Sequence, residues 1–273
     1  MSNPLGFFYN STRNWQKFAG KTGMLVTGRC NRDDRDFARA REAGAEVLAY
    51  FDIVERPDHR VCGPDQAFYM NDYFKVPLWP YPASGVRRSH PKHQLTDMRE
   101  GSAWCKYVLE YFHKLMDGER MSGVFLDVLG ARLWQRSGWD QWPVEERAEW
   151  TNGCIAFARE LDRLRRRSNE NFIVVNNNFW SPDGKTFLEG EKYVDGICIE
   201  HHPISRVSAV LAAGRRYSDL GHRRVLWIAR SPEEARLCAQ VPGVTHVSDQ
   251  QTYGHPDDPP VPFTDLTRRA AET

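Results

Sequence analysis

The strongest constraint on the fold is the alternation of short apolar runs with helical patterns along the chain. Eight such runs occur, at residues 6–9, 24–27, 46–53, 123–128, 172–176, 196–200, 224–228 and 244–248. Helical patterns lie between most of them and after the last, at residues 33–43, 103–116, 144–167, 205–217, 232–239 and 264–271. Strands that alternate with helices pair in parallel, and eight such units close into a barrel. The sequence therefore predicts an α/β fold, a (β/α)8 TIM barrel that forms a single domain over residues 1–273.

Local signals support individual elements of this barrel. Ser231, Pro232 and Glu234 place a capping serine, a proline in the first turn and a glutamate three residues after the serine, which is typical of a helix start. Gly44 follows the predicted helix at 33–43, as a helix-ending glycine should. A doubly wound open sheet is the structural alternative, but no glycine-rich phosphate loop follows the first predicted strand.

Composition narrows the class of partner. The 37 basic and 36 acidic residues nearly cancel, which removes the electrostatic argument for a nucleic acid or an anionic membrane. A neutral, polar ligand such as a polysaccharide or oligosaccharide fits this balance better. The 41% hydrophobic content allows one large core, and the sequence leaves the oligomeric state open.

The chain carries no sign of a membrane span or an export signal. No apolar stretch approaches the roughly 20 residues that cross a bilayer. The first nine residues lack the basic and apolar regions of a signal peptide. We expect a soluble protein that is synthesised in the cytoplasm, with association with a virion or release by another route left open.

Cysteine and histidine spacing argues against a metal site. The six cysteines are scattered without a C-x-x-C pair, so we expect reduced, mostly buried thiols and no zinc site or disulfide framework. His201 and His202 are adjacent, but neighbouring side chains on an extended segment point to opposite sides, and no metal-binding spacing accompanies them. We expect no metal and no cofactor. The basic run at residues 163–167 is typical of a solvated helix end.

Two segments that follow predicted strands are rich in aromatic residues. An insertion loop at about residues 56–101 is far longer than the usual loop of roughly 2 to 6 residues. A second segment, at residues 132–142, carries Trp134, Trp139 and Trp142. In a barrel, both belong to the C-terminal face, where active sites are built.

Two acidic residues end predicted strands. Asp127 closes the run at 123–127, and Glu200 closes the run at 196–200. These are alternate strands by count, so their side chains can converge at the barrel mouth. Two carboxylates in different environments can divide the roles that glycosidic cleavage needs, protonation of the leaving oxygen and attack at the anomeric carbon or on water. The alternative is that each carboxylate caps a helix or pairs with an arginine.

Other polar and aromatic residues are predicted to bind substrate at the same rim. An amide at a strand end can bond a sugar hydroxyl, acidic residues can bind substrate or modify a pKa, and aromatic rings can stack on sugar faces. For Trp227 the competing interpretation is core packing, and for the asparagines it is a turn. The predicted substrate-binding residues are Asn176, Asp52, Glu55, Asn178, Trp134, Trp180, His201, Trp227, Gln250 and Tyr253.

The strand-end motifs resemble those of a known family. The segments at 49–55, 123–127, 174–176 and 194–200 look like the successive motifs of the polygalactosaminidase-like glycoside hydrolases (family 114) and of the related spherulin-like and Pel-type exopolysaccharide hydrolases. The resemblance implies a (β/α)8 enzyme that acts on galactosaminogalactan-like polymers. By position, Asp127, Glu200, Asn176 and Glu55 match the family's acidic and amide residues. The chain departs from the family where Asp52 and Val54 stand in place of the usual serine and glycine, and in the insertion after Glu55.

The leading hypothesis is therefore an endo-acting, metal-independent glycoside hydrolase that cleaves a polysaccharide containing amino sugars. By analogy with barrels that use strands four and six, Asp127 would be the nucleophile or charge stabiliser and Glu200 the general acid/base. One alternative is a non-catalytic carbohydrate-binding or receptor-recognition barrel, such as a component of a phage tail or other particle. Another is a barrel enzyme of different chemistry that uses a metal.

Overall fold

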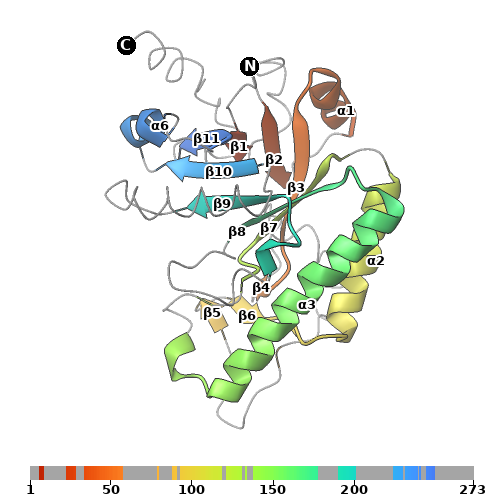
Figure 1. Cartoon of the computed structure of the whole chain (residues 1–273), viewed down its shortest axis with the longest axis vertical. Coiled ribbons are helices and arrows are strands. Elements are labelled where there is room, and N and C mark those ends of the chain that lie inside the picture. Colours follow the sequence, from red (N-terminus) through yellow and green to blue (C-terminus); the bar gives the residue numbers. More distant parts are fainter. Residues whose placement is uncertain are drawn as a thin grey trace.

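The protein folds as a curled, all-parallel sheet, with the long helices α2 (Ala103–Asp117) and α3 (Val144–Ser168) lying together along one side of it (Figure 1). The computed structural model describes residues 6–8, 23–28, 34–57, 79, 88–90, 93–118, 121–130, 133, 138–177, 190–200, 224–229, 231–238, 240 and 244–249. The sheet strands, in spatial order, are β1 (Gly6–Phe8), β2 (Met24–Gly28), β3 (Glu46–Asp52), β7 (Gly123–Asp127), β8 (Ile173–Asn177), β9 (Gly196–Glu200), β10 (Arg224–Ala229) and β11 (His246–Asp249). Each pairs in parallel with its neighbour, and β1 contacts β11. The predicted (β/α)8 barrel and all eight predicted strands are confirmed.

The described helices follow the strands as expected. They are α1 (Asp34–Glu42), α2 (Ala103–Asp117), α3 (Val144–Ser168) and α6 (Pro232–Cys238), with a short 3-10 helix, η6 (Trp139–Gln141). The hydroxyl of Ser231 accepts a hydrogen bond from the Glu234 N–H at 3.1 Å, which confirms the predicted cap of α6. The helices expected at 205–217 and 264–271 lie outside the described residues. No helix in the described part of the chain is long and apolar enough to cross a membrane.

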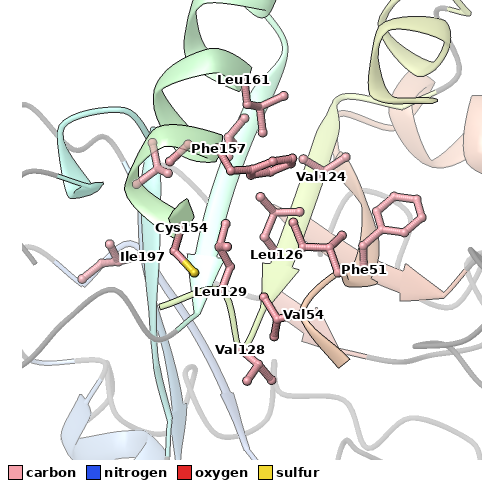
Figure 2. Close-up of a cluster of buried hydrophobic side chains, with 14 of the residues drawn as sticks. Phe51, Val54, Val124, Leu126, Val128, Leu129, Cys154, Phe157, Leu161 and Ile197 are labelled. Carbon is pink, nitrogen blue, oxygen red and sulfur yellow. The ribbon is translucent and has the colours of Figure 1, made fainter. Parts of the chain in front are cut away.

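Alternation along the strands divides the core into two layers. Tyr50, Phe125 and Val175 belong to a cluster inside the barrel. Phe51, Leu126 and Ile197 belong to a second cluster that packs against the helices, and Figure 2 shows Phe157 and Leu161 of α3 beside Val124. Because successive side chains point to opposite faces, this division decides which strand-end residues face the interior.

The described part of the insertion after β3 contains a small sheet. β4 (Glu55–Pro57), β6 (His93–Leu95) and β5 (Arg88–His90) pair antiparallel in that order. Within the same insertion the Trp79 side chain is fully buried, and its indole N–H donates to Glu146 of α3 at 3.0 Å. This part of the insertion therefore packs onto the barrel's helical layer.

Tryptophans expected above the site are partly structural. The Trp79 ring lies 6.4 Å from the Trp142 ring and 4.9 Å from the Trp150 ring, and Trp139 lies 5.2 Å from Trp142. All four are buried. Trp139 and Trp142 therefore join the insertion to α3, and their burial leaves little ring surface for a sugar.

The basic run in α3 is only partly solvated, which corrects the expectation for Arg165. Its guanidinium is buried and bonds Asp162 at 2.8 Å and Asp195 at 2.5 Å. Arg166 remains exposed and pairs with the other oxygen of Asp162 at 2.9 Å. The bonded carboxylates, one on α3 and one just before β9, make Arg165 a link between the helix and the sheet.

Four cysteines fall within described residues, and all are buried free thiols: Cys105, Cys154, Cys198 and Cys238. Burial raises the pKa of Cys105 to about 11 and that of Cys238 to about 12. Both thiols are therefore protonated at neutral pH, and the burial of all four described cysteines agrees with the expectation of mostly buried thiols.

Candidate active site

Asp127 stands at the C-terminal end of β7 and faces the barrel interior, two residues after the interior Phe125. Its carboxylate is half-buried and accepts three hydrogen bonds from uncharged groups. The Tyr50 hydroxyl donates to Oδ2 at 2.5 Å, and the Asn177 amide donates to Oδ1 at 2.8 Å. The Val128 N–H donates to Oδ1 at 2.9 Å. Donors to a carboxylate favour its charged form, so this site holds an oriented anion.

The backbone turns sharply directly after this carboxylate. Val128 adopts a φ of +57°, which is uncommon for any residue with a side chain and more so for a β-branched one. The Leu129 N–H donates to the Asp127 carbonyl oxygen at 2.7 Å, which closes a three-residue turn. Such a conformation costs about 1 to 3 kcal/mol, and strained residues concentrate at functional sites. The turn also aims the Val128 N–H at the Asp127 side chain.

Glu200 ends β9, two strands away from Asp127 in the sheet. Leu126 pairs with Asn176 and Asn177 pairs with Cys198, so Glu200 lies two residues further along the register than Asp127. Closing an eight-stranded barrel staggers neighbouring strands by about one residue each, so two residues over two strands keep level. The backbone of Glu200 therefore reaches the same height of the barrel as Asp127. Its side chain lies outside what the structure describes.

Asp52 is the neighbour of Asp127 on the adjacent strand. The two residues are Cα partners in the pairing of β3 with β7, and each lies two positions after an interior residue, Tyr50 or Phe125. Asp52 is buried, and its Oδ1 accepts hydrogen bonds from the N–H groups of Val54 and Glu55, each at 3.1 Å. Asp52 therefore also fixes the bend by which the chain leaves β3 for β4. Glu55, the first residue of β4, is buried beside it.

Two predicted substrate-binding residues face the helices, which does not fit the expected role. Asn176 is fully buried, and its amide donates to the Leu129 carbonyl at 2.8 Å. Trp227 is also fully buried and belongs to the cluster on the helix side of the sheet. The physical reason is strand alternation, which points Asn177 inwards in place of Asn176 and leaves Trp227 with the core-packing role weighed against binding.

Six predicted site residues lie outside the described residues: Asn178, Trp134, Trp180, His201, Gln250 and Tyr253.

Two residues of the site were not predicted, Tyr50 and Asn177. A count of every second residue back from Asp52 reaches Tyr50, and a count forward from Val175 reaches Asn177. That signal is present in the sequence but needs the facing of each strand to be known first.

Metal-binding side chains do not gather in the part of the chain that the structure covers. There, no three His, Cys, Asp or Glu side chains are grouped so that they could hold an ion. The chemistry available at Asp127 is that of a carboxylate with neutral donors around it.

Comparisons with known proteins show which solved structures share this fold. No protein-family model matches the sequence, and neither does any curated protein. The glycoside hydrolase domain of PelA from Pseudomonas aeruginosa matches with a TM-score of 0.64 at 15% identity, over 92% of this chain and 96% of that one. Aspergillus fumigatus Ega3, in a complex with galactosamine, matches with a TM-score of 0.54 at 13% identity, over 90% and 86%. The chain shares the fold of glycoside hydrolase domains.

A third solved structure shows that the same core occurs inside larger enzymes. An alpha-L-fucosidase from Paenibacillus thiaminolyticus matches with a TM-score of 0.66 at 13% identity, over the whole of this chain but 49% of that one. Barrels of this kind build their active sites at the C-terminal ends of the strands. Asp127, Asn177 and the backbone of Glu200 all lie at that end.

Proposed function

We propose that the protein is a glycoside hydrolase that cleaves a polysaccharide containing amino sugars. The observation that carries this proposal is the oriented Asp127 carboxylate at the C-terminal end of a barrel whose fold is that of glycoside hydrolase domains. Asp127 serves as the nucleophile or charge stabiliser and Glu200 as the general acid/base. The reaction is endo-acting and needs no metal.

The division of roles follows from the environments of the two acids. A carboxylate that accepts three hydrogen bonds is held in the charged form, which suits attack on an anomeric carbon or stabilisation of the positive charge that develops there. The partner must instead deliver a proton to the leaving oxygen, and Glu200 is the acid that ends the next strand but one.

Acidic side chains around the barrel mouth support an amino sugar as substrate. Asp52 and Asp127 are register partners on adjacent strands. Neighbouring carboxylates attract a cationic ammonium group. The solved Ega3 complex contains galactosamine, which is an amino sugar.

The test is release of reducing ends from a panel of amino-sugar polysaccharides, both acetylated and partly deacetylated. We expect turnover by the native protein and a loss of roughly 1,000-fold or more in Asp127→Asn and in Glu200→Gln. Glu46→Gln is the matched control, because Glu46 faces the interior at the opposite end of the same barrel. It should retain activity per folded molecule.

Two results would contradict the proposal. Full activity in either variant would remove that residue from the chemistry. Saturable binding of a polysaccharide with no turnover across the panel would instead support the non-catalytic carbohydrate-binding barrel. Circular dichroism on each variant separates a loss of chemistry from a loss of fold.

A further inference from the structure

Tyr50 is a buried interior residue of β3 whose hydroxyl reaches the candidate nucleophile. Only 2% of the residue is exposed, and its hydroxyl donates to Asp127 Oδ2 at 2.5 Å. Its ring stacks on the Phe125 ring, with centroids 5.8 Å apart and an interplanar angle of 16°. Phe125 lies two residues before Asp127 on the same strand, so the ring forms the layer directly beneath the carboxylate. A packed ring gives the hydroxyl one fixed position.

The two oxygens of Asp127 are treated differently. Oδ1 accepts hydrogen bonds from the Asn177 amide and the Val128 N–H, which accounts for both of its lone pairs. Oδ2 accepts from Tyr50. Tyr50 is therefore the donor that sets the direction of Oδ2.

We propose that Tyr50 is a positioning residue of the hydrolytic site, which acts through Asp127 by holding Oδ2 in one orientation and in its charged form. This inference rests on the proposed function. The phenol keeps its proton, because a tyrosine ordinarily titrates near pH 10 and a carboxylic acid near pH 4. A hydrogen bond to a charged group is stronger than one between two neutral groups, so this contact can fix both the orientation and the charge of Oδ2.

An alternative role for Tyr50 is to fill the interior with its ring. The two roles separate cleanly in Tyr50→Phe, which removes one oxygen and keeps the ring that packs on Phe125. A space-filling role predicts unchanged kinetics. The positioning role predicts that kcat falls by roughly 10- to 100-fold with a smaller change in KM, because the lost contact acts on the reacting carboxylate.

The pH profile gives a second, independent signature. Removing a donor to the charged form raises the pKa of the carboxyl, so the acidic limb of kcat/KM moves to higher pH in Tyr50→Phe. Tyr111→Phe is the matched control. Tyr111 lies on α2 in the helix-side layer, with its ring 5.8 Å from Phe51, so the same deletion there should leave the acidic limb in place.

A third readout needs no turnover. The side-chain carboxyl of Asp127 can be followed by carbon-13 NMR in the full-length protein and assigned by its absence in Asp127→Asn. Its titration should move to higher pH in Tyr50→Phe and stay in place in Tyr111→Phe. An unchanged titration in Tyr50→Phe would overturn the inference.

The outcomes separate the two proposals. A native protein without turnover on any polysaccharide contradicts the proposed function, while the NMR titration still decides whether Tyr50 controls Asp127. An active native protein whose Tyr50→Phe variant keeps its kcat and its acidic limb contradicts the role of Tyr50 alone. Asn177→Leu provides a second variant on the other oxygen, and it should lower kcat as well because Oδ1 loses one of its two donors.

Discussion

The two ends of the barrel hold half-buried carboxylates in different ways. At the N-terminal end, Glu46 of β3 pairs with the guanidinium of Arg224 of β10, whose Nε lies 2.6 Å from Oε2. At the C-terminal end, Asp127 of β7 is held by the Tyr50 hydroxyl, the Asn177 amide and a backbone N–H. A cation neutralises the first carboxylate, whereas neutral dipoles orient the second and leave its charge in place.

We expect the N-terminal ends of the strands to contribute mainly to stability and the C-terminal ends mainly to the reaction. β3 carries Glu46 at its start and Tyr50 and Asp52 towards its end. An ion pair between β3 and β10 joins strands that three others separate in the sheet, so it ties together opposite walls of the barrel. The hydrogen-bond donors from Tyr50, Asn177 and Val128 orient the Asp127 carboxylate at the end where barrels of this kind build their active sites. Changes at the N-terminal end should therefore alter the free energy of unfolding, and changes at the C-terminal end should alter turnover.

The largest expected effect on stability comes from breaking the ion pair. Arg224→Met leaves Glu46 as a partly buried charge without its guanidinium partner, and we expect the free energy of unfolding to fall by about 3 kcal/mol. Urea denaturation at pH 7 measures the loss. Activity per folded molecule should not change, because Arg224 and Glu46 lie at the N-terminal end of the barrel and Asp127 lies at the C-terminal end.

The double variant Glu46→Gln/Arg224→Met sharpens this prediction. It removes the unpaired charge, so it should recover part of the stability that Arg224→Met loses. If the single variant is as stable as the native protein, the pair contributes nothing. If it instead loses turnover while remaining folded, the two ends are not independent.

A smaller effect is expected from pH at the same end. His246, beside Arg224 and Glu46, is buried, and burial lowers its pKa from 6.5 to about 4. The unfolded chain therefore binds more protons than the folded one between these values, so stability is full above pH 6.5 and falls as the pH drops towards 4. We expect a loss of about 2 kcal/mol between pH 7 and pH 5 from this residue.

Urea denaturation of the native protein and of His246→Gln at both pH values isolates the contribution. Other groups titrate in both proteins, so the relevant quantity is the difference between their slopes. His246→Gln should lose stability more gently as the pH falls. Identical slopes in the two proteins would show that His246 does not titrate abnormally in the folded state.

Much of the architecture could be predicted from the sequence, because it depends on patterns that repeat. All eight strands were predicted from apolar runs, and the cap of α6 followed from local residue types. Asp127 stood out because a carboxylate after an apolar run is costly unless it is bonded or used.

The remaining features depend on partners that are distant in the chain. Asn176 and Asn177 are the same type of residue and differ only in which face of β8 they occupy. In the local sequence, Tyr50 looks like an ordinary core residue of a strand. Its role becomes visible only when β3 pairs with β7 and brings its hydroxyl to Asp127, which is 77 residues away. Arg165 resembles its exposed neighbours until Asp195 is brought to it, 30 residues further along the chain. Long-range pairing, which a local pattern does not contain, supplies each of these contacts.

The smallest predicted effect contrasts backbone strain at the two ends. Val128 holds a positive φ at the C-terminal end, whereas Gly118, which ends α2 at the other end, has an ordinary φ of −82°. Glycine tolerates a positive φ and alanine does not. Val128→Gly should therefore be more stable than Val128→Ala by about 0.5 to 1 kcal/mol, although both remove nearly the same side chain.

At Gly118 the order should reverse, because an added Cβ would meet only ordinary contacts, at 3.5 and 3.6 Å. Gly118→Ala should stabilise the protein by about 0.4 to 1 kcal/mol. Thermal and urea denaturation of the three variants measures both differences. If the alanine variant at position 128 is the more stable one, the turn after Asp127 is not strained, and its orientation of the carboxylate depends on hydrogen bonds alone.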